Sequence, residues 1–212
     1  GYTRPAEAAQ AAGLDPRSVH RYIEVLEDLE ILRRRLPLGR RRGARLEIVD
    51  QYFRFYYTLL EPTRSLIEAG AWEEAVEQLE RSIPSYASKT FELAVEQALP
   101  HLARAGALPF TPTRWGPWWH RGEEIDLIAL RPGEAAAFIE AKWSTLTLRE
   151  ARTLLQRLEA KAAKTGLQQP RNHYIVVARE VEDAPEPITM LDEARRVVDY
   201  QRLWPTLRRL RS

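Results

Sequence analysis

The sequence predicts an α/β (α+β) protein made of two successive folded parts. Two observations carry this prediction: residues 1–50 read as helix, turn, helix and hairpin, and residues 85–212 contain the order αβββαβ. A chain of 212 residues is long enough for two small domains, and 44% hydrophobic with 29% charged residues is typical of a folded protein. We therefore expect domains at 1–50 and 85–212, joined by a helical linker at 51–84.

Two helices are expected at the start of the chain. The first has its cap at Thr3, Pro5 in its first turn and its end at Ala11. The second starts at Asp15 and Pro16 and ends near Glu30. Its apolar residues recur at spacings of three and four, which predicts one buried stripe of Val19, Tyr22 or Ile23, Leu26 and Leu29. The opposite face begins with candidates for nucleic-acid contact, namely Arg17, Ser18, His20 and Arg21.

A β-hairpin with a basic tip is expected next, with strands at 31–38 and 46–49. This completes the element order of a winged helix-turn-helix. The formal net charge is +2, and both surplus basic residues lie in the first fifty residues. The segment from Arg33 to Arg45 contains seven arginines and no acidic residue. Because phosphate neutralisation dominates nucleic-acid binding, we predict DNA contact by Arg40, Arg41 and Arg42. The alternatives are a solvated loop and a winged helix that docks on protein.

The linker begins with a run of aromatic residues between Asp50 and Leu60. We interpret this run as a buried helix, since aromatic side chains are usually packed, and a stacking platform for bases is the alternative. Helices are expected at 63–69 and 72–83, and Pro84 is expected to break the helical pattern.

The second part has a regular alternation of elements. A helix at 88–103 precedes a strand-like stretch at 107–119, and strands at 124–130 and 135–142 pair as a hairpin. A helix at 147–164 and a short strand at 173–178 complete the order αβββαβ.

Three residues of the predicted hairpin point to metal chemistry. Side chains alternate across a strand, so Glu140 and Lys142 share one face, while Asp126 is an acid between the apolar Ile125 and Leu127. Two carboxylates from adjacent strands, with water and phosphate oxygens, suffice for Mg²⁺ or Mn²⁺, and the lysine can activate water or stabilise phosphate charge. The alternative is an exposed hairpin with a cross-strand ion pair.

Other candidates near this hairpin have a structural explanation that we prefer. Tryptophans before the acidic strand could stack on unpaired bases, but packed core is the more common role: Trp115, Trp118 and Trp119. His120 and His173 are isolated from other metal-binding residue types, so a structural or surface role is expected for both.

Residues 85–180 resemble the PD-(D/E)XK nuclease family. The resemblance rests on Glu124-Ile125-Asp126 and on Ile139-Glu140-Ala141-Lys142-Trp143. It implies a restriction-endonuclease-like fold, a divalent metal held by Asp126 and Glu140, and a further carboxylate from the preceding helix, where Glu92 has the matching place. A Gln-x-x-x-Tyr element of some exonuclease branches is only half present, since Gln156 is followed by Ala160.

Nearly the whole chain resembles the C-terminal half of an archaeal P-loop ATPase family. The resemblance rests on Tyr52-Phe53-Arg54-Phe55-Tyr56, Phe91-Glu92, Trp118-Trp119 and Glu124-Ile125-Asp126. It implies an N-terminal ATPase module absent from this chain, which has no G-x-x-x-x-G-K-[S/T] motif and starts at Gly1 without methionine, as expected of a fragment.

Composition favours a reducing, cytoplasmic location without membrane insertion, since the chain has no cysteine and no apolar run long enough to cross a bilayer. High Arg, Ala and Glu content with one methionine also suits a thermophile. Two functional hypotheses follow. The first is a Mg²⁺-dependent deoxyribonuclease positioned by the winged helix. The second is a catalytically silent DNA- or protein-binding regulatory module of the ATPase.

Overall fold

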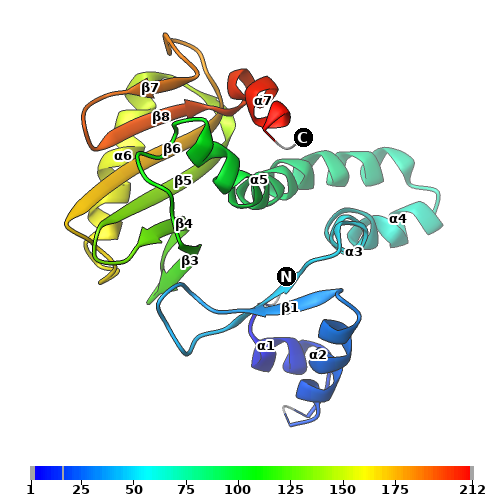
Figure 1. Ribbon diagram of the computed structural model, residues 1–212. Coiled ribbons are helices and arrows are strands. Elements are labelled where there is room, and N and C mark those ends of the chain that lie inside the picture. The colour runs from blue at the N-terminus through cyan, green and yellow to red at the C-terminus, as the bar shows by residue number, and fades with distance from the viewer. Residues whose placement is uncertain (1–2, 16, 211–212) are drawn as a thin grey trace. The chain divides into compact units, whose positions relative to one another are not determined.

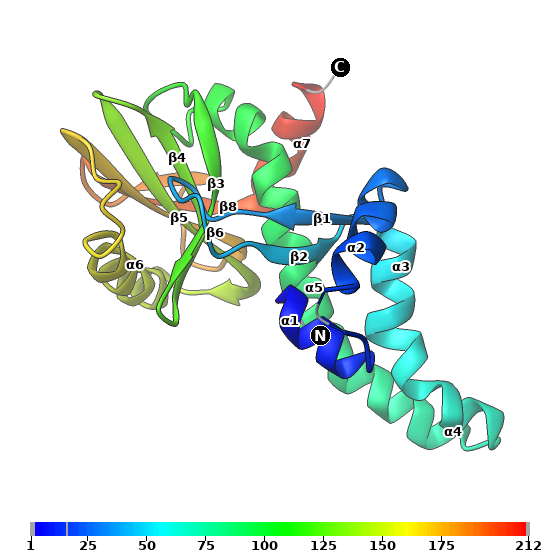
Figure 2. The same ribbon diagram turned by 90° about the horizontal axis from the view of Figure 1, so that it is seen from below.

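The computed structural model describes residues 3–15 and 17–210 and divides the chain into two compact units, Gly1–Tyr86 and Ala87–Ser212 (Figures 1 and 2). The expected mixture of helices and sheet is confirmed. Whether 1–50 and 51–84 are separate domains stays a prediction. None of the helices in the described ranges combines the length and apolar character needed to cross a bilayer.

The first unit opens with helices α1 (Pro5–Ala11) and α2 (Val19–Asp28) and the antiparallel strands β1 (Leu32–Arg35) and β2 (Arg45–Ile48). Its small core contains Ala9, Val19 and Ile23. The expected cap at Thr3 was wrong, because the N-cap residue is Arg4, while the Thr3 carbonyl oxygen accepts a hydrogen bond from the backbone N–H of Leu46. Pro16, expected to start α2, lies outside the described residues.

The prediction that α2 buries one apolar stripe was only partly correct. Val19 and Ile23 are buried, whereas Tyr22, Leu26 and Leu29 are exposed. The apolar residues of α2 therefore extend around the helix beyond the face that packs on α1 and the hairpin. Periodicity showed that the residues share one side of the helix, but it could not show how much of that side is covered.

The linker is helical, as expected, but the predictions that its aromatic run is buried and that Pro84 breaks the helical pattern were wrong. It contains α3 (Gln51–Phe55), a π-helical turn (Tyr56–Leu60), a 3-10 turn (Glu61–Thr63) and α4 (Arg64–Glu68). Several of its aromatic side chains are exposed rather than buried, namely Tyr52, Phe55 and Tyr57. They stack along the helical segment on one another, as Tyr52 does with Tyr56 and Phe53 with Tyr57.

Pro84 does not end a helix, because α5 is continuous from Trp72 to Arg104. Proline lacks the N–H that would bond to the carbonyl of Glu80, which costs about 3 kcal/mol in a helix interior. Helix-forming residues on both sides, and the packing of Phe91, Val95 and Leu99 in the core, offset this cost.

The second unit contains a six-stranded mixed sheet with the order β3-β4-β5-β6-β8-β7. Its strands are β3 (Arg114–His120), β4 (Glu123–Arg131), β5 (Ala135–Leu146), β6 (Arg171–Val181), β7 (Ile188–Met190) and β8 (Arg195–Asp199). Strands β3, β4 and β5 form an antiparallel meander, whereas β5, β6 and β8 are parallel. The element order α5-β3-β4-β5-α6-β6 therefore agrees with the expected αβββαβ.

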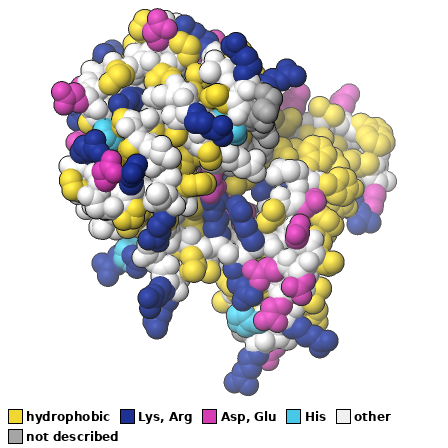
Figure 3. Space-filling model, viewed as in Figure 1, with side chains coloured by type: hydrophobic (Ala, Val, Ile, Leu, Met, Phe, Trp, Pro, Cys, Tyr) yellow, Lys and Arg dark blue, Asp and Glu magenta, His cyan; other side chains and the backbone are white. Residues whose placement is uncertain are grey.

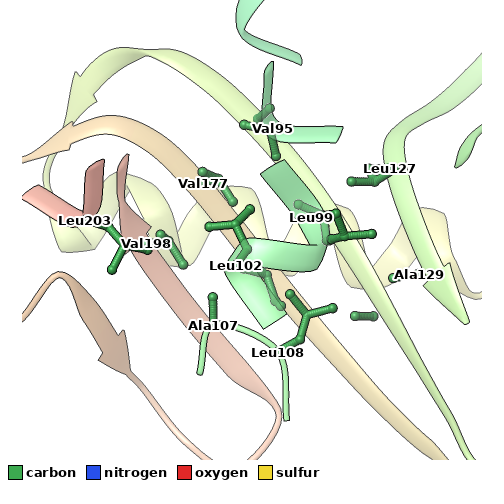
Figure 4. Close-up of a cluster of buried hydrophobic side chains, with 14 of the residues drawn as sticks. Val95, Leu99, Leu102, Ala107, Leu108, Leu127, Ala129, Val177, Val198 and Leu203 are labelled. Carbon is green, nitrogen blue, oxygen red and sulfur yellow. The ribbon is translucent and has the colours of Figure 1, made fainter. Parts of the chain in front are cut away.

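Helices cover both faces of this sheet. The C-terminal half of α5 and helix α7 (Tyr200–Arg209) pack on one face, and α6 (Leu148–Ala162) packs on the other (Figures 1 and 2). Figure 4 shows Val95, Leu99 and Leu102 of α5 directed toward the sheet and α7. Thr147 forms a capping box with Glu150 at the start of α6, which fixes where that helix leaves β5.

Candidate active site

Asp126 and Glu140 lie at one end of the β4-β5 hairpin. The paired register of these strands runs from Arg131 and Ala135 to Leu127 and Ile139, so Asp126 and Glu140 occupy the next positions. The Ala141 backbone N–H donates a hydrogen bond to Oδ2 of Asp126 at 2.8 Å. The Asp126 carboxylate is thus tied to the neighbouring strand just where the hairpin pairing ends.

Both carboxylates and Lys142 project from the face of the sheet that α6 covers. Leu127, Ile139 and Ala141 belong to the core on the α5 face, and alternation along the strands directs the residues between them to the other side. Glu140 is only 8% exposed. A solvated sheet face, the alternative interpretation of the sequence, does not describe this buried carboxylate.

Two lysines hold Glu140. Lys142 Nζ is 2.7 Å from Glu140 Oε1, and Lys161 Nζ on α6 is 3.5 Å from Oε2. The ion pair is therefore made within β5 and with α6 rather than across the hairpin. A largely buried carboxylate needs such compensation, because burial without a partner strongly favours the neutral form.

Asp126 is less well compensated. Its burial and the negative charges of Glu140 and Glu92 raise the pKa of Asp126 from 3.8 to about 7, against the opposing hydrogen bond from Ala141 and the charge of Lys142. The site thus holds a carboxyl group whose ionised form is unfavourable until positive charge arrives. Such perturbed groups are concentrated at functional sites.

Lys142 keeps its proton firmly. Burial favours its neutral amine, but the hydrogen bond to Glu140 and the charges of Glu140, Asp126 and Glu92 outweigh burial and raise the pKa of Lys142. Lys142 is therefore a fixed positive charge. It is suited to stabilise negative charge on a phosphate rather than to accept a proton.

Glu92, the third expected carboxylate, lies on α5 and is bound by Lys89, with 2.6 Å between Lys89 Nζ and Glu92 Oε2. Its charge acts on Asp126 and Lys142. Across residues 3–15 and 17–210, however, no group of three or more His, Cys, Asp or Glu side chains is placed to hold a metal ion. A cation in this arrangement would depend on Asp126 and Glu140.

Lys161 was not predicted from the sequence. It flanks the buried stripe of α6, which contains Leu155, Leu158 and Ala162. A basic residue beside the buried stripe of the helix that follows Glu140 and Lys142 was the available signal. Only the return of α6 across the sheet brings Lys161 to Glu140.

The aromatic and histidine candidates have different positions. Trp118 is buried, whereas Trp115 is exposed. Trp143, next to Lys142, packs at 5.5 Å from Phe91 between ring centroids and lies under the guanidinium of Arg179 at 5.4 Å. Burial and nearby Arg196 lower the pKa of His173, which is consistent with a structural role.

The predicted nucleic-acid contacts are all on the surface of the first unit. In the loop between β1 and β2, Arg40, Arg41 and Arg42 are exposed, and Figure 3 shows basic side chains projecting there. The arginines of β1 differ, because Arg33 and Arg35 pair with Glu47 and Arg34 pairs with Glu27. Four exposed residues lie just before α2 or in its first turn: Arg17, Ser18, His20 and Arg21.

Comparison with known proteins gives a family match without a known activity. Residues 56–154 match the family model DUF234, described as archaea bacterial proteins of unknown function. The uncharacterized protein MJECL04 of Methanocaldococcus jannaschii is 32% identical over 165 residues, covering 76% of this chain and 37% of that protein. The chain thus spans little more than a third of the length of this curated relative. No solved structure matches the chain.

Proposed function

We propose that the unit Ala87–Ser212 is a restriction-endonuclease-like domain of the PD-(D/E)XK type and a divalent-metal-dependent deoxyribonuclease. The observation that carries the proposal is the pair Asp126 and Glu140 on adjacent strands, with Lys142 and Lys161 at Glu140. The order of elements around this pair, from α5 to β6, is the order that the resemblance implies.

The residues present fit a hard divalent cation. Mg²⁺ is commonly held by one or two carboxylates with water and phosphate oxygens, and Asp126 and Glu140 supply carboxylates of this kind. The raised pKa of Asp126 reflects negative charge that a cation would compensate. Mg²⁺ or Mn²⁺, when bound, would supply an activated water and charge neutralisation at the phosphate.

The protein side chains would have separate tasks. Asp126 and Glu140 would hold the cation, with Glu92 adding negative charge from α5. Lys142 would place its fixed positive charge beside the scissile phosphate, and Lys161 would orient Glu140. Arg40, Arg41 and Arg42 on the winged helix, with Arg17, Ser18, His20 and Arg21, would bind the DNA backbone. An N-terminal P-loop ATPase module of the kind that the resemblance implies would regulate cleavage.

A cleavage assay tests the proposal. The protein is incubated with supercoiled plasmid, linear duplex and branched DNA in Mg²⁺ or Mn²⁺, and strand breaks are measured on gels. We expect cleavage that is lost in Asp126→Asn, Glu140→Gln and Lys142→Met. The matched control is Glu193→Gln, which changes an exposed carboxylate in the turn between β7 and β8 and retains cleavage. Cleavage unchanged by the three site variants would refute the assignment.

One observation favours the second hypothesis, a silent DNA- or protein-binding regulatory module of the ATPase. Both carboxylate oxygens of Glu140 have a lysine partner, and Lys89 pairs with Glu92. The site is thus partly neutralised by the protein's own cations. This hypothesis predicts salt-sensitive DNA binding without cleavage of any of the three substrates.

A further inference from the structure

Helix α2 has a second apolar stripe that its own fold leaves uncovered. Val19 and Ile23 enter the core, whereas Tyr22, Val25 and Leu29 are 54%, 51% and 62% exposed. Their spacing of three and four residues places the exposed three on one side of the helix. Single exposed apolar residues are ordinary, but a continuous stripe of three large side chains indicates an interaction surface.

The apolar surface continues from α2 onto α3. A hollow of about 420 Å³ is lined by apolar side chains of α2, α3 and neighbouring elements of the first unit, including Tyr22, Leu26, Phe53 and Tyr57. Tyr57 is itself exposed. The stripe on α2 thus has beside it a concave apolar site that could receive side chains of a partner.

The charges on α2 run against the helix dipole. The first turn has no acidic residue and the last turn has no basic residue. Instead His20 and Arg21 lie near the N-terminus, and Glu24 and Asp28 lie toward the C-terminus, all four exposed. This order is unfavourable for an isolated helix, because acids are favoured near the N-terminus and bases near the C-terminus. A neighbouring helix with the opposite direction would compensate both ends at once.

We propose that this face of α2 binds the same face of a second copy of the chain, with the two helices antiparallel. Arg21 and Asp28 are seven residues apart, so they lie on the same flank of the stripe. In an antiparallel pair the same flanks face each other, and Arg21 of each copy meets Asp28 of the other. The twofold axis then passes between positions 24 and 25, midway between the two residues.

A second copy fits this face better than a DNA backbone does. Tyr22, Val25 and Leu29 offer no positive charge to phosphates. The same face of a second copy, in contrast, is apolar and is flanked by the complementary charges of Arg21 and Asp28. Neither Arg21 nor Asp28 has an ion pair among the described residues. In this dimer, which is independent of the proposed nuclease activity, Arg21 belongs to the interface between the two copies and no longer to the DNA-binding surface. Arg17, Ser18, His20 and the loop arginines remain for DNA, with two basic loops per dimer.

The oligomeric state of the full chain tests the proposal. Because a single helix pair is a small interface, we expect a dimer with a dissociation constant on the order of micromolar, measured by sedimentation and by light scattering over a range of concentrations. Val25→Glu places two like charges near the axis and should yield a monomer. The matched control is Val76→Glu, since Val76 is 53% exposed on α5 and should not affect dimerisation. A wild-type monomer at about 100 µM, or a dimer unaffected by Val25→Glu, would overturn the proposal.

A charge exchange tests the antiparallel arrangement. Arg21→Glu alone and Asp28→Arg alone each create like-charge contacts twice per dimer, and each should weaken dimerisation by about tenfold or more. The double variant with both changes restores opposite charges and should return the dissociation constant to within about threefold of wild type. Two single losses that simply add in the double variant would rule out this pairing.

A covalent trap locates the axis. The chain contains no cysteine, so Val25→Cys introduces a single thiol. Under mild oxidation this variant should form a disulfide-linked dimer, because the two copies of position 25 lie beside the axis. Val76→Cys is the control with similar exposure, and it should remain uncrosslinked. Equal crosslinking of the two variants would contradict the proposed geometry.

Discussion

The two units differ in how they use apolar side chains. The second unit packs α5, α7 and several strands into one continuous cluster, and that packing supports a carboxylate pair at the end of β4 and β5. The first unit has a small core around Ala9, Val19 and Ile23 and leaves large apolar and basic side chains exposed. Dense packing can hold charges in unfavourable surroundings, whereas an open surface offers those side chains to other molecules.

The largest expected effect comes from a substitution that creates a cavity in the core of the second unit. Leu99 is fully buried in the cluster, so Leu99→Ala should reduce the free energy of unfolding by about 2–5 kcal/mol. Leu29→Ala, which truncates an exposed leucine of the first unit, should change it by less than about 0.5 kcal/mol at concentrations where the protein is monomeric. Chemical denaturation followed by tryptophan fluorescence and circular dichroism measures both. Equal losses would show that the packing contrast is not real.

The second prediction concerns the cost of holding Asp126. Its pKa of about 7 in the folded protein is above the ordinary 3.8, so the folded state binds an extra proton between these values. The contribution of Asp126 to the free energy of unfolding therefore falls as pH rises from about 4 to 7 and changes no further above pH 7, a total loss on the order of 4 kcal/mol. Asp126→Asn keeps an oxygen that can accept the Ala141 hydrogen bond and removes this cost.

Thermal unfolding as a function of pH checks the prediction for Asp126→Asn. The variant should melt several degrees above wild type at pH 8, and the difference should nearly disappear at pH 4. Asp192→Asn is a useful control of opposite sign, because hydrogen bonds from Ala194 and Arg195 overcome the effect of its limited burial and lower the pKa of Asp192. A melting temperature of Asp126→Asn equal to or below that of wild type at pH 8 would show that the ionised Asp126 carboxylate does not destabilise the folded protein.

The features that local pattern determines were predictable. Alternation along β5 placed Glu140 and Lys142 on one face, and the pairing of β4 with β5 as a hairpin brought Asp126 beside Glu140. Thr147 and Glu150 likewise mark the start of α6 by their spacing alone.

What depends on distant packing was not predictable. The exposure of Tyr22 and Leu29 depends on what covers α2, and the continuity of α5 through Pro84 depends on its contacts with the sheet. Lys161 reaches Glu140 only because α6 crosses back over β5. No helix or strand was predicted from the sequence after residue 178. Strand β7 is only three residues long, which is too short for a recognisable pattern. The start of α7 did leave a local signal, because the Asp199 side chain caps this helix by accepting a hydrogen bond from the N–H of Arg202.

The third prediction tests whether the exposed arginines of the first unit act on nucleic acid. Changing Arg40, Arg41 and Arg42 together to Gln should weaken DNA binding by roughly tenfold to a hundredfold near 0.1 M salt. It should also reduce the slope of log affinity against log salt by about 2.7, or 0.9 for each phosphate contact. Fluorescence anisotropy with a labelled duplex measures both quantities. Arg33→Gln is the control, because Arg33 already pairs with Glu47. An unchanged salt slope in the triple variant would remove the loop from the DNA interface.

The smallest expected effect is the stabilisation of the folded protein by a divalent cation bound at Asp126 and Glu140. At pH 8 and constant ionic strength, Mg²⁺ or Mn²⁺ at ten times its dissociation constant should stabilise the wild-type protein by about 1.4 kcal/mol, seen as a rise of a few degrees in melting temperature. Asp126→Asn and Glu140→Gln should lack this rise, whereas Glu193→Gln should retain it. Because the cation must displace the proton of Asp126, the stabilisation should fade as pH drops below about 7. A rise that is equal in wild type and Asp126→Asn, or independent of pH, would show that the cation binds at another place and does not compensate the charge of Asp126.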